Sequence, residues 1–190
     1  MEINNLFNNF KCINNIFRGT VPAQVFNELV SMSEFCRIYK DSELSALRNI
    51  GNTCTSIHQY YIPFAQVNQS FTLPYINLCA QKFISIIDSG FNKTLAVLLK
   101  NTDQNILTYD MWVNYYSCGD VIHPHYHDNC VVAGIVFIKN SSEATYFENQ
   151  EEIMGKPGDI ILFPSTLQHW TKIQNSQLER VTISFNCSIL

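Results

Sequence analysis

Three of the five histidines stand close together, in the segment His123-Pro124-His125-Tyr126-His127-Asp128. Imidazole is the commonest metal ligand among protein side chains near neutral pH. Because residues i and i+2 of a strand point to the same face, His125 and His127 could both contact one metal ion. One more donor would complete a site with three protein ligands. The segment therefore predicts either a metal centre or, as the simpler interpretation, a polar turn with exposed histidines.

Two residues further along the chain could complete such a site. His169 follows His127 by 42 residues, and Arg180 follows His169 by 11 residues. A His-x-His pair on one strand end and a distant histidine on another can hold a metal ion and leave open positions for substrates and O₂. An arginine on the next strand could hold a carboxylate through a pair of parallel hydrogen bonds.

After residue 105 the sequence pattern predicts short strands, and these strands must position the residues named above. The candidate strands cover residues 106–116, 131–138, 144–148, 159–163 and 180–188. In the last strand, apolar residues alternate with the polar residues Arg180, Thr182, Ser184, Asn186 and Ser188. This alternation fits an ordinary half-exposed strand, and it also fits a barrel strand whose polar face lines an internal pocket.

Before residue 105, apolar residues recur mostly at helical spacing. The predicted helices begin near Thr20-Val21-Pro22, at Asp41-Ser42-Glu43-Leu44 with an end at Gly51, and near Ile76 with an end at Gly90. Residues 57–63 fit either a strand or an extended loop. We expect a single structural domain, in which a helical part over residues 1–104 packs on a β-sandwich or barrel formed by residues 105–190.

Composition narrows the class of partner. The chain has a net charge of −4 and no dense run of Lys and Arg, which disfavours a nucleic acid or a membrane surface. It has no stretch of 18 apolar residues and no signal-peptide pattern at its start. Its seven cysteines are widely spaced without a CxxC pair, which indicates reduced thiols in the cytoplasm. Cys118 and Cys130 flank the histidines, so a thiolate ligand stays an alternative.

Over residues 109–187 the chain resembles the iron(II)/2-oxoglutarate-dependent oxygenases, especially members common in phage and marine bacterial genomes. The matching segments are Trp112-Val113-Asn114-Tyr115-Tyr116, Gly119-Asp120, His125-Tyr126-His127, residues 132–137, residues 158–165, His169 and residues 180–186. The resemblance implies a mainly β fold: a double-stranded β-helix core (jelly-roll, cupin-like) with flanking N-terminal α-helices. It implies Fe(II) as cofactor, 2-oxoglutarate and O₂ as co-substrates, and hydroxylation or another oxidation of a substrate with release of succinate and CO₂.

The resemblance also implies roles for single residues. His125 matches the first iron ligand, His169 matches the distal histidine ligand, and Arg180 matches the residue that binds the distal carboxylate of 2-oxoglutarate. The residues implied to line the co-substrate pocket are Thr182, Asn114 and Tyr116.

The chain departs from the family pattern at His127, where a carboxylate ligand usually stands. We expect His127 to be the third ligand; otherwise two residues hold the metal or activity is lost. Asp128 would reach the metal only through a β-bulge. His123 shares the parity of His125, so it is a candidate for a supporting group or for an alternative ligand.

Two other functions stay open. The spacing of Gly119 to His125-Tyr126-His127, and of Gly158 to His169, resembles the cupin motifs, and three-histidine iron sites occur in cupin-type thiol dioxygenases. Arg180 would then bind a carboxylate of the substrate itself. A catalytically inactive β-barrel binding protein is the remaining alternative. The substrate is expected to be a small molecule or a protein residue, and residues 1–104 to form either a substrate lid or a homodimer surface. For a phage protein, the compartment would be the host cytoplasm.

Overall fold

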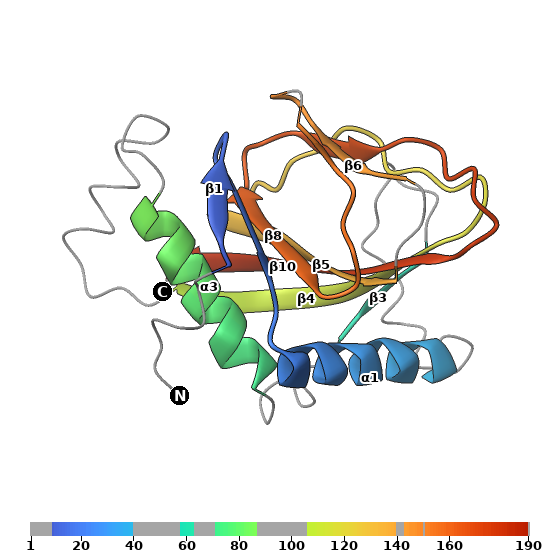
Figure 1. Cartoon of the computed structure of the whole chain (residues 1–190), viewed down its shortest axis with the longest axis horizontal. Helices are drawn as coiled ribbons and strands as arrows, with labels where there is room; N and C mark the ends of the chain where they lie inside the picture. Colours follow the sequence, from blue (N-terminus) through green and yellow to red (C-terminus); the bar gives the residue numbers. More distant parts are fainter. Residues whose placement is uncertain are drawn as a thin grey trace.

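The computed structural model describes residues 9–39, 58–62, 71–86, 106–139, 143–149 and 151–189. These residues form two antiparallel β-sheets that face each other, and two helices cover the outer face of the larger sheet (Figure 1). The predicted helix that starts at Asp41 lies outside the described residues, as do Gly51 and Gly90. Neither described helix is long and apolar enough to cross a membrane.

The larger sheet has seven strands in the order β1-β2-β8-β5-β10-β4-β3. Their bounds are β1 Lys11–Ile13, β2 Ile16–Thr20, β8 Asp159–Pro164, β5 Val132–Lys139, β10 Arg180–Ile189, β4 Ile106–Tyr116 and β3 His58–Tyr61. The smaller sheet has the order β7-β6-β9, with β7 Glu152–Ile153, β6 Thr145–Phe147 and β9 His169–Thr171. The predicted jelly-roll core with flanking helices is confirmed.

The five strands predicted after residue 105 are present, with bounds that differ from the prediction by at most one residue. The segment around residues 57–63, left open between strand and loop, contains strand β3. The hairpin of β1 and β2 was not predicted, although its sequence carries a signal. Asn14 and Asn15 both have positive φ, of 49° and 62°, and they join Ile13 to its partner Ile16 as a two-residue hairpin loop. The part of the chain before residue 105 therefore adds strands to the sheet as well as helices.

The two described helices are α1, Ala23–Tyr39, and α3, Thr72–Ile86. Helix α1 follows Pro22, whose carbonyl accepts the first helical hydrogen bond from the Phe26 N–H at 2.9 Å. Helix α3 is capped from outside itself, because the Glu28 carboxylate accepts hydrogen bonds from the N–H and hydroxyl of Thr72 at 3.0 and 2.7 Å. An anion at a helix N-terminus satisfies free N–H groups and the helix dipole. This contact ties α1 to α3.

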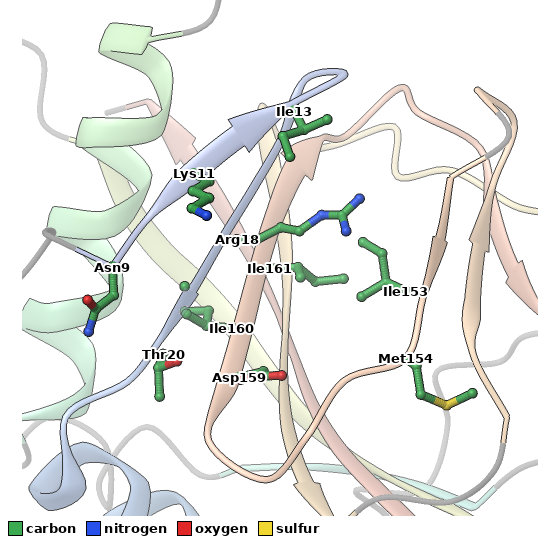
Figure 2. A pocket seen from close by; sticks show the side chains of 11 residues that line it. Asn9, Lys11, Ile13, Arg18, Thr20, Ile153, Met154, Asp159, Ile160 and Ile161 are labelled. Carbon is green, nitrogen blue, oxygen red and sulfur yellow. The ribbon is translucent and has the colours of Figure 1, made fainter.

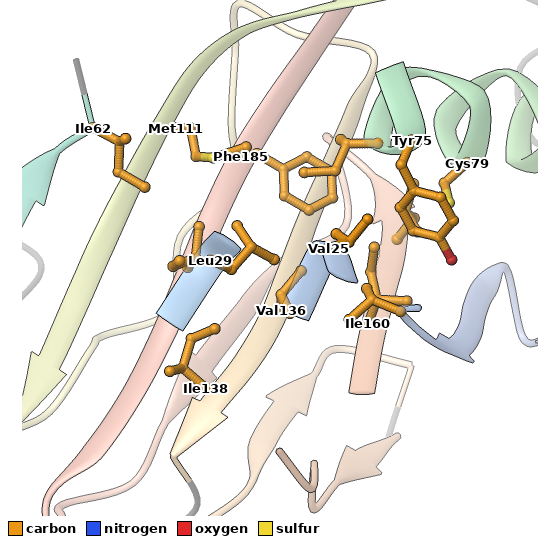
Figure 3. Close-up of a cluster of buried hydrophobic side chains, with 14 of the residues drawn as sticks. Val25, Leu29, Ile62, Tyr75, Cys79, Met111, Val136, Ile138, Ile160 and Phe185 are labelled. Atoms are coloured by element: carbon orange, nitrogen blue, oxygen red, sulfur yellow. The ribbon is translucent and has the colours of Figure 1, made fainter. Parts of the chain in front are cut away.

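Apolar side chains on the outer face of the larger sheet pack against both helices to form the main core (Figure 3). Val25 and Leu29 of α1 and Cys79 of α3 are buried in it together with Val136 of β5 and Phe185 of β10. A second cluster fills the space between the two sheets, where Phe137, Phe147, Ile161 and Phe163 are buried. Since successive strand residues point to opposite faces, β10 places its apolar residues toward the helices and its polar residues toward the smaller sheet.

Candidate metal centre

Backbone hydrogen bonds hold the histidine segment against the smaller sheet. His125 pairs with His169 in an antiparallel bridge, with N–H to O distances of 3.1 Å in one direction and 2.9 Å in the other. The N–H of His127 donates to the carbonyl of Ser165 at 2.9 Å. The loop after β4 is therefore fixed beside β9, and residues far apart in sequence share one site.

The side chains of His125, His127 and His169 converge. One nitrogen from each ring can be chosen so that all three lie within 4.8 Å of one another. Three nitrogens bound to one ion at about 2.1 Å lie about 3.0–3.4 Å apart, so the rings have to approach one another by at most about 2 Å. The three imidazoles could therefore form a metal centre with three protein ligands. We found no carboxylate or thiolate in this group within the described part of the chain.

The other candidates near the histidines lie elsewhere. The side chains of His123 and Asp128 are exposed and do not join the group of three. Cys118 is exposed, and the thiol of buried Cys130 donates a hydrogen bond to the side-chain oxygen of Asn186 at 3.4 Å. His123 instead contacts the site through its backbone: its carbonyl oxygen is 2.9 Å from Nδ1 of His125.

Two of the histidines are oriented by carbonyl groups. Nδ1 of His125 faces the carbonyl of His123, and Nδ1 of His169 faces the carbonyl of Leu167 at 3.2 Å. A carbonyl oxygen accepts only, so each Nδ1 must carry the proton, and each Nε2 keeps its lone pair. Hydrogen bonds of this kind fix the tautomer and the ring direction of metal-binding histidines. Both rings are therefore set up to donate through Nε2.

Burial keeps the three imidazoles neutral. Desolvation lowers the pKa of His125 from its ordinary value, and lowers that of His169 much further. Desolvation, together with the neighbouring His125, lowers the pKa of His127 to about 4. A metal ion binds the neutral form of imidazole, so at neutral pH no proton has to be displaced from these rings.

Arg180 lies deep in the same interior. It is only 1% exposed, and its Nη2 donates to the hydroxyl of Thr145 at 2.7 Å. Its guanidinium lies over the rings of Tyr116 and Phe137, at 4.8 and 5.6 Å from the ring centres. Its Nε is buried without a hydrogen-bond partner, and none of the ion pairs among the described residues involves it. Burial lowers the pKa of Arg180, but a guanidinium stays protonated in proteins. A buried, unpaired cation of this kind calls for an anion.

Polar groups continue from Arg180 along the inner faces of β10 and β4. Arg180 stands opposite Tyr116 and Thr182 opposite Asn114 in the strand register. The Asn114 amide donates to the hydroxyls of Thr182 and Ser184 at 3.1 and 2.9 Å. Thr182 is 0% exposed, so the alternation in β10 is that of a strand whose polar face points into the molecule.

A cavity of about 30 Å³ lies between the histidines and this polar row. Its lining residues are Trp112, Asn114, Tyr116, Ile122, His125, His127, Ile135, Thr145, His169, Trp170, Thr171 and Ser184. The volume suits about one or two water molecules, so a larger ligand requires neighbouring side chains to move. Thr145 and Thr171 were not singled out in the sequence. Thr145 lies on the same strand face as Phe147, and Thr171 lies on the same strand face as His169. This spacing of two residues is the sequence signal that could have identified them.

A larger cavity of about 350 Å³ lies elsewhere, beside β1, β2, β8 and the end of β7 (Figure 2). Lys11, Arg18, Met154 and Asp159 are among the residues that line it, and it shares no lining residue with the histidine cavity. Histidine and cysteine are absent from its lining, so it offers no comparable set of metal ligands.

The two facing sheets and the converging histidines define a jelly-roll protein with a candidate metal centre between its sheets. Residues 140–186, which include His169 and Arg180, match the sequence model of a family described as "Putative 2OG-Fe(II) oxygenase". Among curated protein sequences, none matches the chain.

Solved structures of this class share the fold. A prolyl-4-hydroxylase from Pseudomonas putida superposes with a TM-score of 0.57 at 12% identity, over 92% of each chain. The viral collagen prolyl hydroxylase from Paramecium Bursaria Chlorella virus-1, in a 2OG complex, gives 0.51 at 14% identity, over 92% of this chain and 96% of the other. SnoK, a non-heme alpha ketoglutarate dependent carbocyclase from nogalamycin biosynthesis, gives 0.56 at 6% identity, over 98% and 83%. The sequence match over residues 140–186 confirms the predicted resemblance to the iron(II)/2-oxoglutarate-dependent oxygenase superfamily, and the solved structures show that the fold is shared.

Proposed function

We propose that the protein is a non-haem Fe(II)- and 2-oxoglutarate-dependent dioxygenase that hydroxylates or otherwise oxidises a substrate with release of succinate and CO₂. One observation supports this most strongly: the unpaired guanidinium of Arg180 is buried on the same interior face as the three converging imidazoles. A metal ion and a buried cation held apart in this way suit a ligand with a carboxylate at each end, one for the metal and one for the arginine.

The residues present fit the metal. His125, His127 and His169 would hold Fe(II) through ring nitrogens, with the carbonyls of His123 and Leu167 orienting two of the rings. When bound, the iron would supply the activation of O₂, which protein side chains do not provide. The protein's own part is to hold the ligands in place and to keep water out.

Aromatic side chains perform much of this second task. The rings of Phe147 and Phe163 lie 5.9 and 4.7 Å from the ring of His169, and Trp112 lies 6.0 Å from His127. They restrict the motion of the imidazoles and exclude solvent from one side of the centre. A dry site strengthens every charge interaction inside it and protects reactive species from side reactions.

Arg180 would bind the distal carboxylate of 2-oxoglutarate. The hydroxyl of Thr145 and the ring of Tyr116 position its guanidinium, and the Asn114 amide directs the hydroxyl of Thr182 on the adjacent part of β10. A carboxylate bound to Arg180 would supply the ion pair that no described residue forms with it. Binding there would place the other end of the co-substrate toward the histidines.

An anaerobic titration tests this proposal. Protein loaded with Fe(II) is expected to develop a visible metal-to-ligand charge-transfer band when 2-oxoglutarate is added, and to form succinate once O₂ is admitted. The Arg180→Gln variant should lose the band at the same 2-oxoglutarate concentration. Arg18→Gln should keep it, because Arg18 is paired with Glu151 and does not line the histidine cavity. If wild-type protein binds Fe(II) but gives neither band nor succinate, the proposal is wrong.

The all-histidine ligand set also suits a cupin-type metalloenzyme such as a thiol dioxygenase, in which Arg180 would bind a carboxylate of the substrate itself. The same titration separates the two functions. Iron uptake with no response to 2-oxoglutarate, combined with O₂ consumption on addition of a carboxylated thiol, supports this second function. A folded protein that takes up no iron supports a non-catalytic binding protein.

A further inference from the structure

A row of side chains on the inner face of β10 and β4 extends beyond the histidine cavity. It consists of four cross-strand pairs: Arg180 with Tyr116, Thr182 with Asn114, Ser184 with Trp112, and Asn186 with Asp110. Each of the first three pairs contributes at least one residue to the lining of the cavity, whereas Asn186 and Asp110 contribute none. Two residues along a strand advance by roughly 7 Å, so this last pair lies just past the end of the cavity.

Asp110 lies on the side of the candidate metal centre away from Arg180. Its neighbour on the same face of β4 is Trp112, whose ring centre lies 6.0 Å from that of His127. 2-Oxoglutarate held between the metal and Arg180 would occupy the part of the row before Trp112. The part that begins at Asp110 is then available to a substrate at the same metal.

Hydrogen bonds join this end of the row to the histidine segment. The side-chain oxygen of Asn186 accepts a hydrogen bond from the Cys130 thiol at 3.4 Å. The Cys130 carbonyl accepts one from the Ser165 hydroxyl at 2.6 Å, and the Ser165 carbonyl accepts one from the His127 N–H at 2.9 Å. With its oxygen engaged in this way, the Asn186 amide presents its NH₂ group to Asp110.

The carboxylate of Asp110 has fewer partners than its burial requires. Its Oδ2 accepts a hydrogen bond from the Asn186 amide at 3.4 Å, which is long for a charged acceptor, and its Oδ1 is buried with no hydrogen-bond partner. None of the ion pairs among the described residues involves Asp110. A buried carboxylate oxygen without a donor is costly. The side chain as a whole is half-buried, and rotation about its last bond exchanges the two oxygens, so a ligand can reach either of them.

We propose that Asp110 binds the substrate through a cationic nitrogen group, an ammonium or a guanidinium. Such a group brings the N–H donors and the positive charge that this carboxylate lacks among the described residues. Burial raises the pKa of the Asp110 carboxyl to about 6, so the group is mostly ionised at neutral pH and can form this ion pair. The inference rests on the proposed function and deepens it, because it names the chemical class of the substrate: a cation.

A second role for Asp110, balancing the charge of the metal ion, makes a different prediction. Asp110 is not a member of the ligand group, and Trp112 separates it from the histidine cavity along β4. If it served the metal, removing its charge would weaken metal binding and leave the binding of a cation unchanged. The variant Asp110→Asn distinguishes the two roles, because it removes the charge and keeps the shape of the side chain.

Methylguanidinium and N-methylurea are suitable probes, because they have nearly the same shape and differ in charge. Each is titrated into metal-free protein at neutral pH in the presence of a chelator, and ¹H–¹⁵N NMR follows the backbone amides of residues 110–112 and Asn186. We expect methylguanidinium to shift these signals in the wild type. It should bind Asp110→Asn at least about tenfold more weakly, because a charge-assisted hydrogen bond is lost, and N-methylurea should bind the wild type more weakly by a similar factor. The matched control Asp159→Asn removes a carboxylate from the lining of the separate cavity in Figure 2 and should bind methylguanidinium as the wild type does.

Unshifted signals in the wild type would overturn the inference, as would equal binding of the two probes. Equal binding of methylguanidinium by wild type and Asp110→Asn would also overturn it, and a loss of Co(II) affinity in the same variant would then assign Asp110 to the charge balance of the metal. If Asp110→Asn does not fold, the wild type decides alone: methylguanidinium must shift the ¹³C signal of the Asp110 carboxyl, and N-methylurea must leave it in place. Failure of the proposed function is a separate outcome. It appears in the iron titration as a missing band and missing succinate, whereas the metal-free protein reports the binding of the cation alone.

Discussion

Arg180 stands directly opposite Tyr116 in the register of β10 and β4, and its guanidinium carbon lies 4.8 Å from the centre of the tyrosine ring. The ring supplies one face of a buried cation site, and the Thr145 hydroxyl supplies a hydrogen-bond acceptor at its edge. Both Tyr116 and Thr145 also line the histidine cavity, which connects the arginine to the candidate metal centre.

Replacing Arg180 by glutamine should weaken 2-oxoglutarate binding by about thirtyfold to 150-fold, because a charge-assisted hydrogen bond in a buried site contributes about 2–3 kcal/mol. Isothermal titration calorimetry of the anaerobic Fe(II) protein measures this affinity. Arg180→Lys should also bind weakly, since an ammonium lacks the planar fork. An unchanged dissociation constant in both variants would remove Arg180 from the co-substrate site.

Thr145→Val removes the acceptor that positions Nη2 of Arg180 while it keeps the volume of the side chain. We expect about a tenfold loss of 2-oxoglutarate affinity, in keeping with roughly 1–1.5 kcal/mol for a buried hydrogen bond. The matched control is Thr108→Val, because Thr108 is a buried β4 residue whose hydroxyl is bonded to Asn77 instead. That control should lower stability without changing the affinity; equal affinity losses in both would indicate a general packing effect.

Metal uptake should depend on the converging histidines and not on the exposed one. Wild-type protein dialysed against Fe(II) or Co(II) under anaerobic conditions is expected to retain one ion per chain. His169→Ala should retain little metal, because loss of one of three ligands removes much of the binding free energy. His123→Ala should retain metal as wild type does, since only its backbone carbonyl supports the site. Elemental analysis gives the ratio, and normal uptake by His169→Ala would refute the ligand set.

The metal-free protein should lose stability as the pH falls from neutral. Burial lowers the folded-state pKa values of His125, His127 and His169. Below the ordinary value of 6.5, these histidines therefore bind protons in the unfolded chain but stay neutral in the folded chain. For His127, whose pKa falls to about 4, the loss on passing from pH 6.5 to pH 4 is roughly 3 kcal/mol.

Asp110 works in the opposite direction, because its raised pKa of about 6 makes the folded state take up a proton first and gain stability as the pH falls. Three histidines outweigh this one carboxyl. Urea unfolding midpoints measured in a chelator across this pH range test the sign, and His127→Asn should flatten the dependence. A midpoint that rises on acidification would contradict the neutral, buried state of the rings.

Local pattern in the sequence was enough for the strands that carry the site. The period-two alternation in residues 180–188 and the apolar runs of residues 131–138 and 159–163 each predict a strand without reference to the rest of the chain. The β1–β2 hairpin was missed because the segment is short and its signal rests on Asn14 and Asn15, whose left-handed backbone is unusual for residues other than glycine.

The sequence by itself determined which chemistry was available: imidazoles at i and i+2, a distant histidine, and an arginine at a fixed spacing from it. Only the tertiary structure decided that His125 pairs with His169 across a bridge and that His123 contributes a carbonyl and not a ring. It also decided that Arg180 is buried and forms no ion pair with another described residue. Residue types and parity are local properties of the chain. The depth of a side chain and its partners depend on which strands are neighbours. That order is set by how the two sheets pack with each other and with the two described helices.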